Sequence, residues 1–271
     1  MAYIDINGKE YNSLENIPEG AMFDELDLSY RNITKLPEEL STITVKKLNL
    51  ENCWSLLSLE GLPQGLEEFI CFRTGITSLK GLPEGLKKLN CCFTHMTSLK
   101  GLPEGLEELH CDFCINLTSL KGLSQGLKAL TCAGTLITSL EGLPKELKEL
   151  DCSNTHITSL EGLPKGLKKL DCNSCESLTS LKGCPEGLKE INCHHCNSLI
   201  SLKGVPKSVK MIDCYGCNKL KYIPDYIPDE AIEGLSKEKI AKCRDNWKKE
   251  QERKKASEQQ RAAITKRFMG R

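Results

Sequence analysis

The chain has 271 residues, of which 39% are hydrophobic and 27% are charged, and its 37 basic side chains balance its 37 acidic ones. No apolar run approaches the roughly 18 residues that a membrane-spanning helix needs, and the first residues lack the positively charged start and apolar stretch of a secretory signal peptide. We therefore expect no membrane span and a cytoplasmic location, in which the 16 cysteines stay reduced rather than forming disulfides.

Residues 1–22 are predicted to form an N-terminal cap or half-repeat. Residues 13–20, with the sequence SLENIPEG, echo an SLxGLPxG segment that returns many times further along the chain. A stack of repeats exposes apolar surface at both ends, so a degenerate terminal unit is needed to cover it.

Residues 23–228 repeat an L-x-x-L-x-(Leu/Cys) signature ten times, at intervals of 20 to 22 residues. The last position of the signature falls at Leu28, Leu50, Cys71, Cys91, Cys111, Cys132, Cys152, Cys172, Cys193 and Cys214. Self-similarity at this period indicates a solenoid, in which each repeat forms one coil of a stack.

One repeat, residues 147–167, reads LKELDCSNTHITSLEGLPKGL and illustrates how a coil is built. Leu147, Leu150 and Cys152 have the spacing of a short strand that leads into a bend with these side chains buried. Gly and Pro in the return segment exclude a helix there, so we expect an extended or polyproline-like path. Equivalent strands should then align as a parallel sheet.

The pattern L-x-x-L-x-C-x-x-T-x-I-T-S-L-x-G-L-P-x-G resembles the short bacterial leucine-rich repeat of the YopM and IpaH effector families, over about four fifths of the chain. The resemblance implies an α/β repeat solenoid. This is a leucine-rich-repeat horseshoe with a parallel β-sheet on its concave face, an extended or polyproline-like convex face and a short C-terminal helix. It also implies a bacterial effector that reaches a host-cell cytosol by a route without a signal peptide. The chain departs from these families by carrying Thr or Cys where they carry Asn, and Cys where they carry Val or Leu.

The Thr or Cys position covaries with the length of the bend. Repeats with Thr run C-x-x-T-x-(Ile/Met), whereas repeats with Cys have one more residue before the next Leu. Both side chains can donate a hydrogen bond to a buried carbonyl, as Asn does in related repeats. The thiols at the signature position are expected to be buried, because a free thiol behaves as a small hydrophobe.

Charged doublets between the strand leucines change sign from one repeat to the next. Examples are Glu67-Glu68, then Lys87-Lys88, then Glu107-Glu108. In a parallel stack these doublets lie side by side, so the correct register pairs opposite charges and a slipped register opposes like charges.

Residues 229–271 are predicted to form a C-terminal capping helix and a basic tail. Ile240, Cys243 and Trp247 recur at helical spacings of three and four, so this apolar stripe should seal the last coil. From residue 237 onward there are 13 basic and 5 acidic side chains, a net charge of +8 that the rest of the chain balances with −8. Beyond Trp247 we expect a frayed, charged helix or a disordered tail. Acidic residues interrupt the basic ones, so nucleic acid is not the expected partner.

Two cysteine motifs suggest chemistry, but neither is expected to carry it. Cys172-x-x-Cys175 and Cys193-x-x-Cys196 have the spacing of a zinc site, yet the repeat period alone produces that spacing. Cys243-Arg244-Asp245 matches the Cys-x-Asp motif that the resemblance to IpaH ligases would make catalytic, but the long helical catalytic module of that family does not fit in the residues that follow the repeats.

The candidate binding site is a group of apolar, aromatic and basic residues in repeats three to six, on the predicted concave face and its adjoining bends. The outward positions there are occupied by Ile70, Phe72, Arg73, Phe93, His110 and Phe113. Other repeats carry mostly Asp, Asn, Ser or Lys at these positions. Exposed aromatic residues beside an arginine are typical of interaction hot spots. The alternative is that the phenylalanines stack on one another and cover the sheet edge.

The sequence thus predicts a non-enzymatic protein-interaction scaffold, monomeric, without a cofactor, catalytic residue or metal ligand. It would bind an unidentified protein partner on its concave face. Two alternatives remain: the substrate-recognition subunit of a ubiquitin-ligase-type assembly, and a zinc-binding module.

Overall fold

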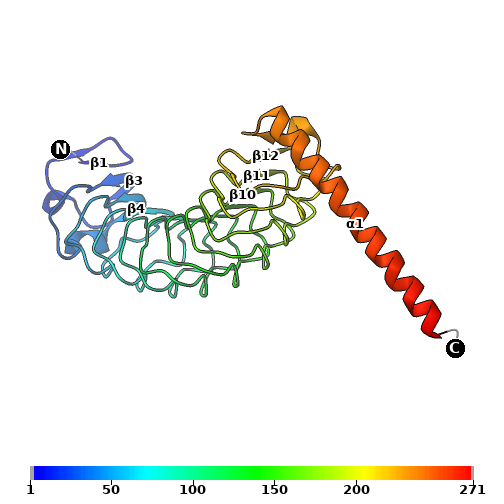
Figure 1. Ribbon diagram of the computed structural model, residues 1–271. Helices are drawn as coiled ribbons and strands as arrows, with labels where there is room; N and C mark the ends of the chain where they lie inside the picture. The colour runs from blue at the N-terminus through cyan, green and yellow to red at the C-terminus, as the bar shows by residue number, and fades with distance from the viewer. Residues whose placement is uncertain (1–2, 270–271) are drawn as a thin grey trace.

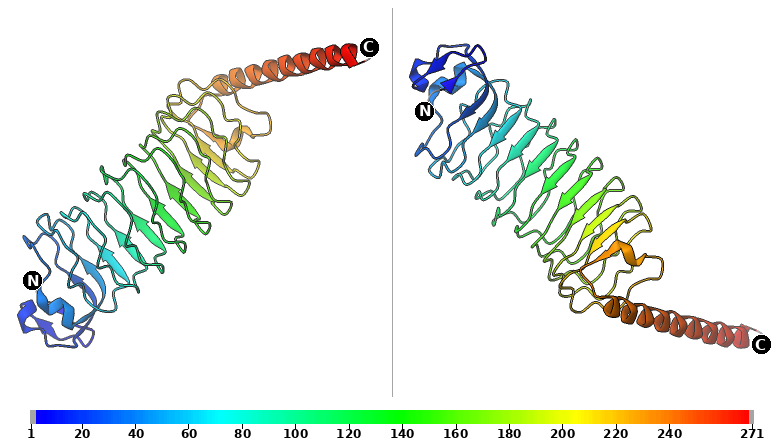
Figure 2. Two further views of the ribbon diagram at one scale, coloured as in Figure 1. Left: turned by 90° about the horizontal axis from the view of Figure 1, so that it is seen from below. Right: turned by 90° about the horizontal axis from the view of Figure 1, so that it is seen from above.

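The computed structural model describes residues 3–269, apart from the side chains of residues 264 and 266–269. Residues 1–2 of the predicted cap and residues 270–271 of the predicted tail lie outside this range. The chain forms a curved stack of coils with a parallel sheet on the inner side of the curve, and one long helix leaves the C-terminal end (Figure 1). Two further views show the strands side by side along the stack (Figure 2).

The large sheet has 11 parallel strands in sequence order, from β3 to β13. They are β3 (Met22–Asp27), β4 (Thr44–Asn49), β5 (Glu68–Ile70), β6 (Lys88–Asn90), β7 (Glu108–His110), β8 (Ala129–Thr131), β9 (Glu149–Asp151), β10 (Lys169–Asp171), β11 (Glu190–Asn192), β12 (Met211–Asp213) and β13 (Ile232–Glu233). Each of the ten signatures supplies one strand, β3 to β12, so the predicted repeats are confirmed. The eleventh strand, β13, was not predicted because residues 232–233 follow no signature.

The interior of the stack is built by the signature residues. Leu150 and Cys152 are buried, whereas Glu149 and Asp151, which alternate with them along the strand, point out of the sheet. The same alternation repeats in register, with Leu150 beside Leu130 on one side and Leu170 on the other. Of the 16 thiols, all but Cys184 are buried, which confirms the expected core role of cysteine.

The charged doublets pair across neighbouring strands as expected. Lys87 lies 2.8 Å from Glu67, and Lys88 lies 2.9 Å from Glu108. These pairs are exposed and each contributes about 0–1 kcal/mol at most. Their alternation therefore matters more for strand register than for stability.

Between β4 and β12 the return segments contain no helix, and their glycines allow the coils to approach closely. Gly183 has φ +106°, and a Cβ atom there would lie 2.6 Å from the carbonyl oxygen of Leu160 in the preceding coil. Any other residue would have to adopt a strained backbone and push the coils apart. The SLxG glycine thus sets the spacing of the stack.

Short elements close the N-terminal end. An antiparallel pair, β1 (Tyr3–Ile4) and β2 (Glu10–Tyr11), precedes the 3-10 helix η1 (Leu14–Asn16), and a second 3-10 helix, η2 (Glu38–Thr42), lies between β3 and β4. Tyr3, Tyr11 and Leu14 are buried against the first coil. This segment therefore does more than repeat half a coil, because its hairpin adds two buried tyrosines.

The C-terminal end carries η3 (Asp229–Ala231) and then α1 (Lys237–Met269), a helix of 33 residues. Ile240 and Cys243 are buried, and Arg244 donates a hydrogen bond of 2.8 Å to the carbonyl of Pro224. From residue 252 to 263 the side chains of α1 are exposed. A C-terminal helix is thus confirmed, but it continues without a break to Met269, through the segment for which fraying or disorder was expected. The division at residues 1–22, 23–228 and 229–271 stays a prediction.

Candidate functional site

Each coil leaves its strand through a bend that contains one residue in the left-handed region. Its φ lies between +51° and +59° where the residue is not glycine. The residues are Tyr30, Asn52, Arg73, Phe93, Phe113, Asn154, Ser174 and His195, and Gly134 and Gly216 hold the equivalent places in their coils. Glycine and asparagine adopt this conformation readily, whereas bulky side chains rarely do. The bend itself therefore does not explain why Phe93 and Phe113 occupy this position.

An aromatic ridge, formed by Trp54, Phe72, Arg73, Phe93 and Phe113, runs along these bends. The rings of Phe72 and Phe93 meet edge to face with centroids 5.2 Å apart, and those of Phe93 and Phe113 stack at 4.6 Å. The Arg73 guanidinium lies 5.1–5.7 Å from the ring centroids of Trp54, Phe72 and Phe93. Trp54, Phe93 and Phe113 are 63%, 38% and 41% exposed. The rings thus contact one another and still face solvent.

The ridge ends where Gly134 replaces a side chain. A Cβ atom at Gly134 would lie 2.6 Å from the Phe113 ring, so the missing side chain is what allows that ring to lie over the next coil. Arg73 pairs with no carboxylate among the ion pairs of residues 3–269. The ridge therefore combines open ring surface with a cation that is free for a partner.

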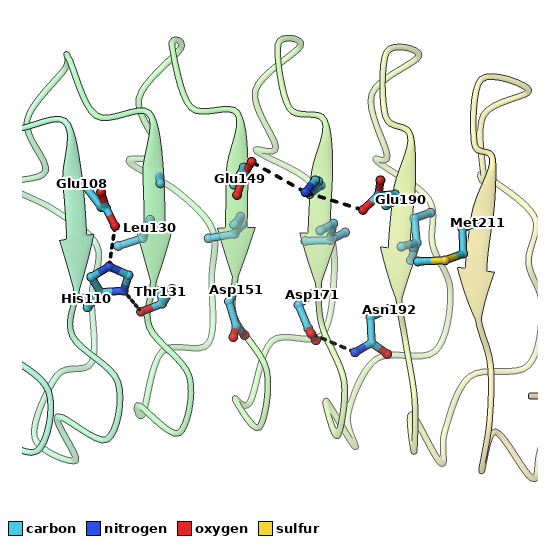
Figure 3. Close-up of a pocket in the computed structure, with 15 residues that line it drawn as sticks. Glu108, His110, Leu130, Thr131, Glu149, Asp151, Asp171, Glu190, Asn192 and Met211 are labelled. Carbon is cyan, nitrogen blue, oxygen red and sulfur yellow. Dashed lines mark hydrogen bonds and ion pairs between the residues drawn. The ribbon is translucent and has the colours of Figure 1, made fainter. Parts of the chain in front are cut away.

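Four of the six predicted site residues lie in the ridge, and the other two lie on the sheet face. Ile70 is the last residue of β5, in register with Asn90 of β6. His110 of β7 has Nδ1 3.0 Å from Thr131 Oγ1 and Nε2 2.8 Å from Glu108 Oε1 (Figure 3). Both nitrogens of His110 are thus engaged within the protein, so this side chain supports the face rather than extending from it.

His110 also marks one end of a shallow hollow on the concave face. The hollow has a volume of about 320 Å³ and extends from β7 to β12, where Asp151, Asp171, Asn192 and Met211 line it (Figure 3). Burial raises the pKa of the Asp151 carboxyl, and the Ser153 hydrogen bonds oppose that rise. The hollow is shallow, and most of its open surface is apolar although carboxylates and an amide line it.

Trp54 was missed by the sequence interpretation, although it belongs to the same surface. It follows Cys53 in the bend of the second coil, and a residue at that place is exposed in other coils too: Ile115 is 56% exposed and Leu136 45%. Comparing the residue that follows the Cys or Thr of each bend would have identified Trp54 from the sequence. The exposed apolar surface of this edge is therefore larger than the six residues predicted.

The Thr and Cys bends satisfy buried carbonyls in different ways. The Thr155 hydroxyl donates to the Cys152 carbonyl of its own coil at 2.6 Å. In the longer bend, the backbone amide of Cys175 donates to the Cys172 carbonyl of its own coil. The Cys175 thiol donates to the Cys152 carbonyl of the preceding coil at 3.3 Å. In the longer bend the side chain therefore links two coils, because the backbone amide already donates to the carbonyl of its own coil.

The paired cysteines of the late repeats and Cys243 are buried in the structure. Within residues 3–269, no group of three or more His, Cys, Asp or Glu side chains is arranged to hold a metal ion. Cys243 is 1% exposed and its thiol donates to the Leu220 carbonyl at 3.4 Å. No helix in the described part of the chain is long and apolar enough to cross a bilayer.

A second aromatic group lies in the last coils. The His194 and His195 rings stack at 4.4 Å, and Tyr215 meets both edge to face. His195 lies over Gly216, whose Cβ would come within 2.3 Å of the His195 ring. In both groups an aromatic ring lies over a glycine in the bend of the next coil: Phe113 over Gly134 and His195 over Gly216.

The repeats resemble those of solved structures, while no protein-family model and no curated protein matches the chain. YopM from Yersinia enterocolitica WA-314 is 25% identical with a TM-score of 0.61, and the match covers 78% of this chain and 45% of YopM. The functional domain of InlJ from Listeria monocytogenes, which includes a cysteine ladder, is 20% identical with a TM-score of 0.52, over 74% of this chain and 50% of that one. The structure of the mouse RP105/MD-1 complex is 18% identical with a TM-score of 0.54, and the match covers 76% of this chain and 40% of that one. The chain thus spans less than half of the YopM structure. It forms a leucine-rich-repeat solenoid whose repeats resemble those of YopM.

Proposed function

We propose that the chain is a non-enzymatic scaffold that recognises another protein through the aromatic ridge and the adjoining concave face. The observation that supports this most directly is the presence of Phe93 and Phe113 in left-handed bends, where neighbouring coils carry Gly134 and Asn154. Strained residues that the fold does not require are typical of functional sites. The ridge also has the composition of a hot spot, with Trp, Phe and Arg together.

The chemistry of the ridge indicates the kind of partner surface that fits it. Three phenylalanine rings and Trp54 offer apolar contact, and Arg73 lies between them without a carboxylate partner. A complementary surface would place an apolar or aromatic side chain on the rings and a carboxylate on Arg73. The resemblance of the repeats to bacterial effector repeats supports action in a host cytosol.

Affinity capture from a host-cell lysate tests the proposal, with the triple variant Phe72→Ser/Phe93→Ser/Phe113→Ser beside the unchanged chain. Captured proteins are identified by mass spectrometry, and their affinity for each variant is then measured with the purified partner. We expect the triple variant to bind at least about 30-fold more weakly, which corresponds to the loss of a single hot spot.

Tyr215→Ser is the matched control, because Tyr215 is also an exposed aromatic residue in a bend but lies outside the ridge. It should leave capture unchanged. Equal capture by the triple variant and the unchanged chain, with unchanged circular dichroism, would refute the role of the ridge.

A further inference from the structure

A second open surface lies at the C-terminal end, between α1 and the last three coils. It is a groove of about 570 Å³, lined by Trp247, Glu250 and Lys254 from the helix and by Ile200, Tyr222, Lys182 and Lys203 from the coils, so three lysines face one carboxylate, which pairs with Lys254. The coil side is held in register by parallel bridges from Ser180 to Ser201 and from Ser201 to Tyr222. The groove is therefore built by four separate segments of the chain.

The helix side of the groove is fixed by contacts of the α1 residues that precede Trp247. Ile240 and Cys243 are buried under the first turns of α1. Arg244 donates to the Pro224 carbonyl at 2.8 Å, and the Asn246 amide donates to the Lys221 carbonyl at 3.2 Å. Because these contacts hold α1 against the last coil just before Trp247, the groove exists without a ligand and binding would require little ordering.

The groove combines an apolar interior with a cationic rim. Ile200 is 41% exposed beside Trp247 and Tyr222. Lys182 and Lys254 each have a carboxylate within 4 Å, but Lys203 has none among the ion pairs of residues 3–269. The segment from residue 237 onward adds a net charge of +8. A ligand for this groove would carry negative charge around one apolar group.

We propose that the groove binds an acidic peptide segment of a partner protein. An apolar side chain of that segment would lie against Trp247 and Ile200, and its carboxylates would meet Lys182, Lys203 and Lys254. A lipid surface fits less well, because residues 252–263 of α1 include no apolar side chain larger than alanine and interfacial helices need a broad apolar face.

Trp247 supplies a direct readout of this binding. The chain has only two tryptophans, so in a Trp54→Phe background the fluorescence reports on Trp247 alone. The probe is a 12-residue peptide of alternating Glu and Asp with a central Leu-Phe pair. The comparison probes are the same peptide with Ser-Ser at the centre, and a 12-nucleotide single-stranded DNA.

We expect the Leu-Phe peptide to change Trp247 fluorescence saturably and to bind at least tenfold more tightly than the Ser-Ser peptide or the DNA. Ile200→Ser, and the double variant Lys203→Glu/Lys254→Glu, should each weaken binding at least tenfold. The double variant Lys207→Glu/Lys255→Glu is the matched control, since it changes the net charge equally at exposed lysines outside the groove, and it should change affinity less than threefold.

Three results would overturn the proposal: no saturable binding at 1 mM peptide, equal binding of the Ser-Ser peptide or the DNA, or equal weakening by the control double variant. The triple phenylalanine variant keeps the groove intact and should bind the peptide normally. The experiments can therefore refute the binding role of the ridge and that of the groove independently.

Discussion

At the scale of single residues, Phe93 combines an unfavourable backbone conformation with favourable ring contacts. A left-handed conformation costs an L-residue about 1–2 kcal/mol. Each of the two ring pairs that Phe93 makes contributes about 0.5–1.5 kcal/mol. The two effects are similar in size and opposite in sign, so Phe93 should be close to neutral for stability. This balance supports the proposal that Phe93 contributes to binding rather than to folding.

This balance predicts a specific outcome for Phe93→Asn. Asparagine tolerates the left-handed bend, so the free energy of unfolding should change by less than about 1 kcal/mol. Leu109→Ala, which empties a fully buried position in the next coil, should cost about 2–5 kcal/mol. Urea denaturation measures both. A loss above 2 kcal/mol for Phe93→Asn would mean that the ridge holds the stack together.

The sequence predicted which side chains share the site, but not all of the contacts that they make. The spacing of Phe72, Phe93 and Phe113 placed them in neighbouring bends, and their rings do meet. The engagement of His110 with Glu108 and Thr131 could not be predicted, because it depends on side-chain directions across two strands. Likewise, the sequence shows that Cys accompanies the longer bend, but not that its thiol joins two coils.

At the scale of elements, α1 consists of an attached first part and a projecting second part. Ile240 and Cys243 are buried against the last coil, whereas residues 252–263 are exposed. A solenoid needs such a cap, because each coil is stabilised mainly by its neighbours. Capping by Ile240 and Cys243 could be predicted from their helical spacing, but Trp247, the third residue of the predicted stripe, is only half-buried and lines the groove. The unbroken continuation of the helix could not, because few apolar residues mark that segment.

Truncation separates the two parts of α1. A chain that ends after residue 251 should keep the thermal stability of the intact chain within about 2 °C, because the side chains of residues 252–263 are exposed. A chain that ends after residue 236 loses the burial of Ile240 and Cys243, which is worth roughly 3 kcal/mol in the terminal coil. Amide hydrogen exchange should then show β12 and β13 unprotected. Retained protection of β13 in the shorter chain would contradict a capping role.

At the scale of the whole molecule, the buried thiols make the stability of the stack depend on pH. Burial raises the pKa of the thiols of Cys71, Cys111 and Cys132 well above the ordinary value of 9.0. In the unfolded chain these thiols ionise near pH 9, while in the folded chain they stay protonated. Above pH 9 the unfolded state therefore binds fewer protons than the folded state. The stabilisation is complete below pH 9 and is lost as pH rises.

The free energy of unfolding should therefore fall above pH 9 by about 1.4 kcal/mol per pH unit for each such thiol. Cys132→Ala should lower stability at pH 7, because it leaves a cavity, but should make the fall above pH 9 shallower by that amount. Urea midpoints at pH 7 to 10.5 provide the measurement. An identical slope in the variant and the unchanged chain would show that Cys132 is not buried as a thiol.

The most direct test of the stacked-coil account is the alkylation of thiols in the folded protein, followed by mass spectrometry. Stacking in register buries every cysteine except Cys184, which is half-buried, and this partial burial still raises the pKa of Cys184 to about 12. At pH 7.5 iodoacetamide should thus modify Cys184 first and slowly, and should reach all 16 thiols only in denaturant. Rapid modification of signature cysteines such as Cys111 or Cys152 in the folded protein would contradict the account.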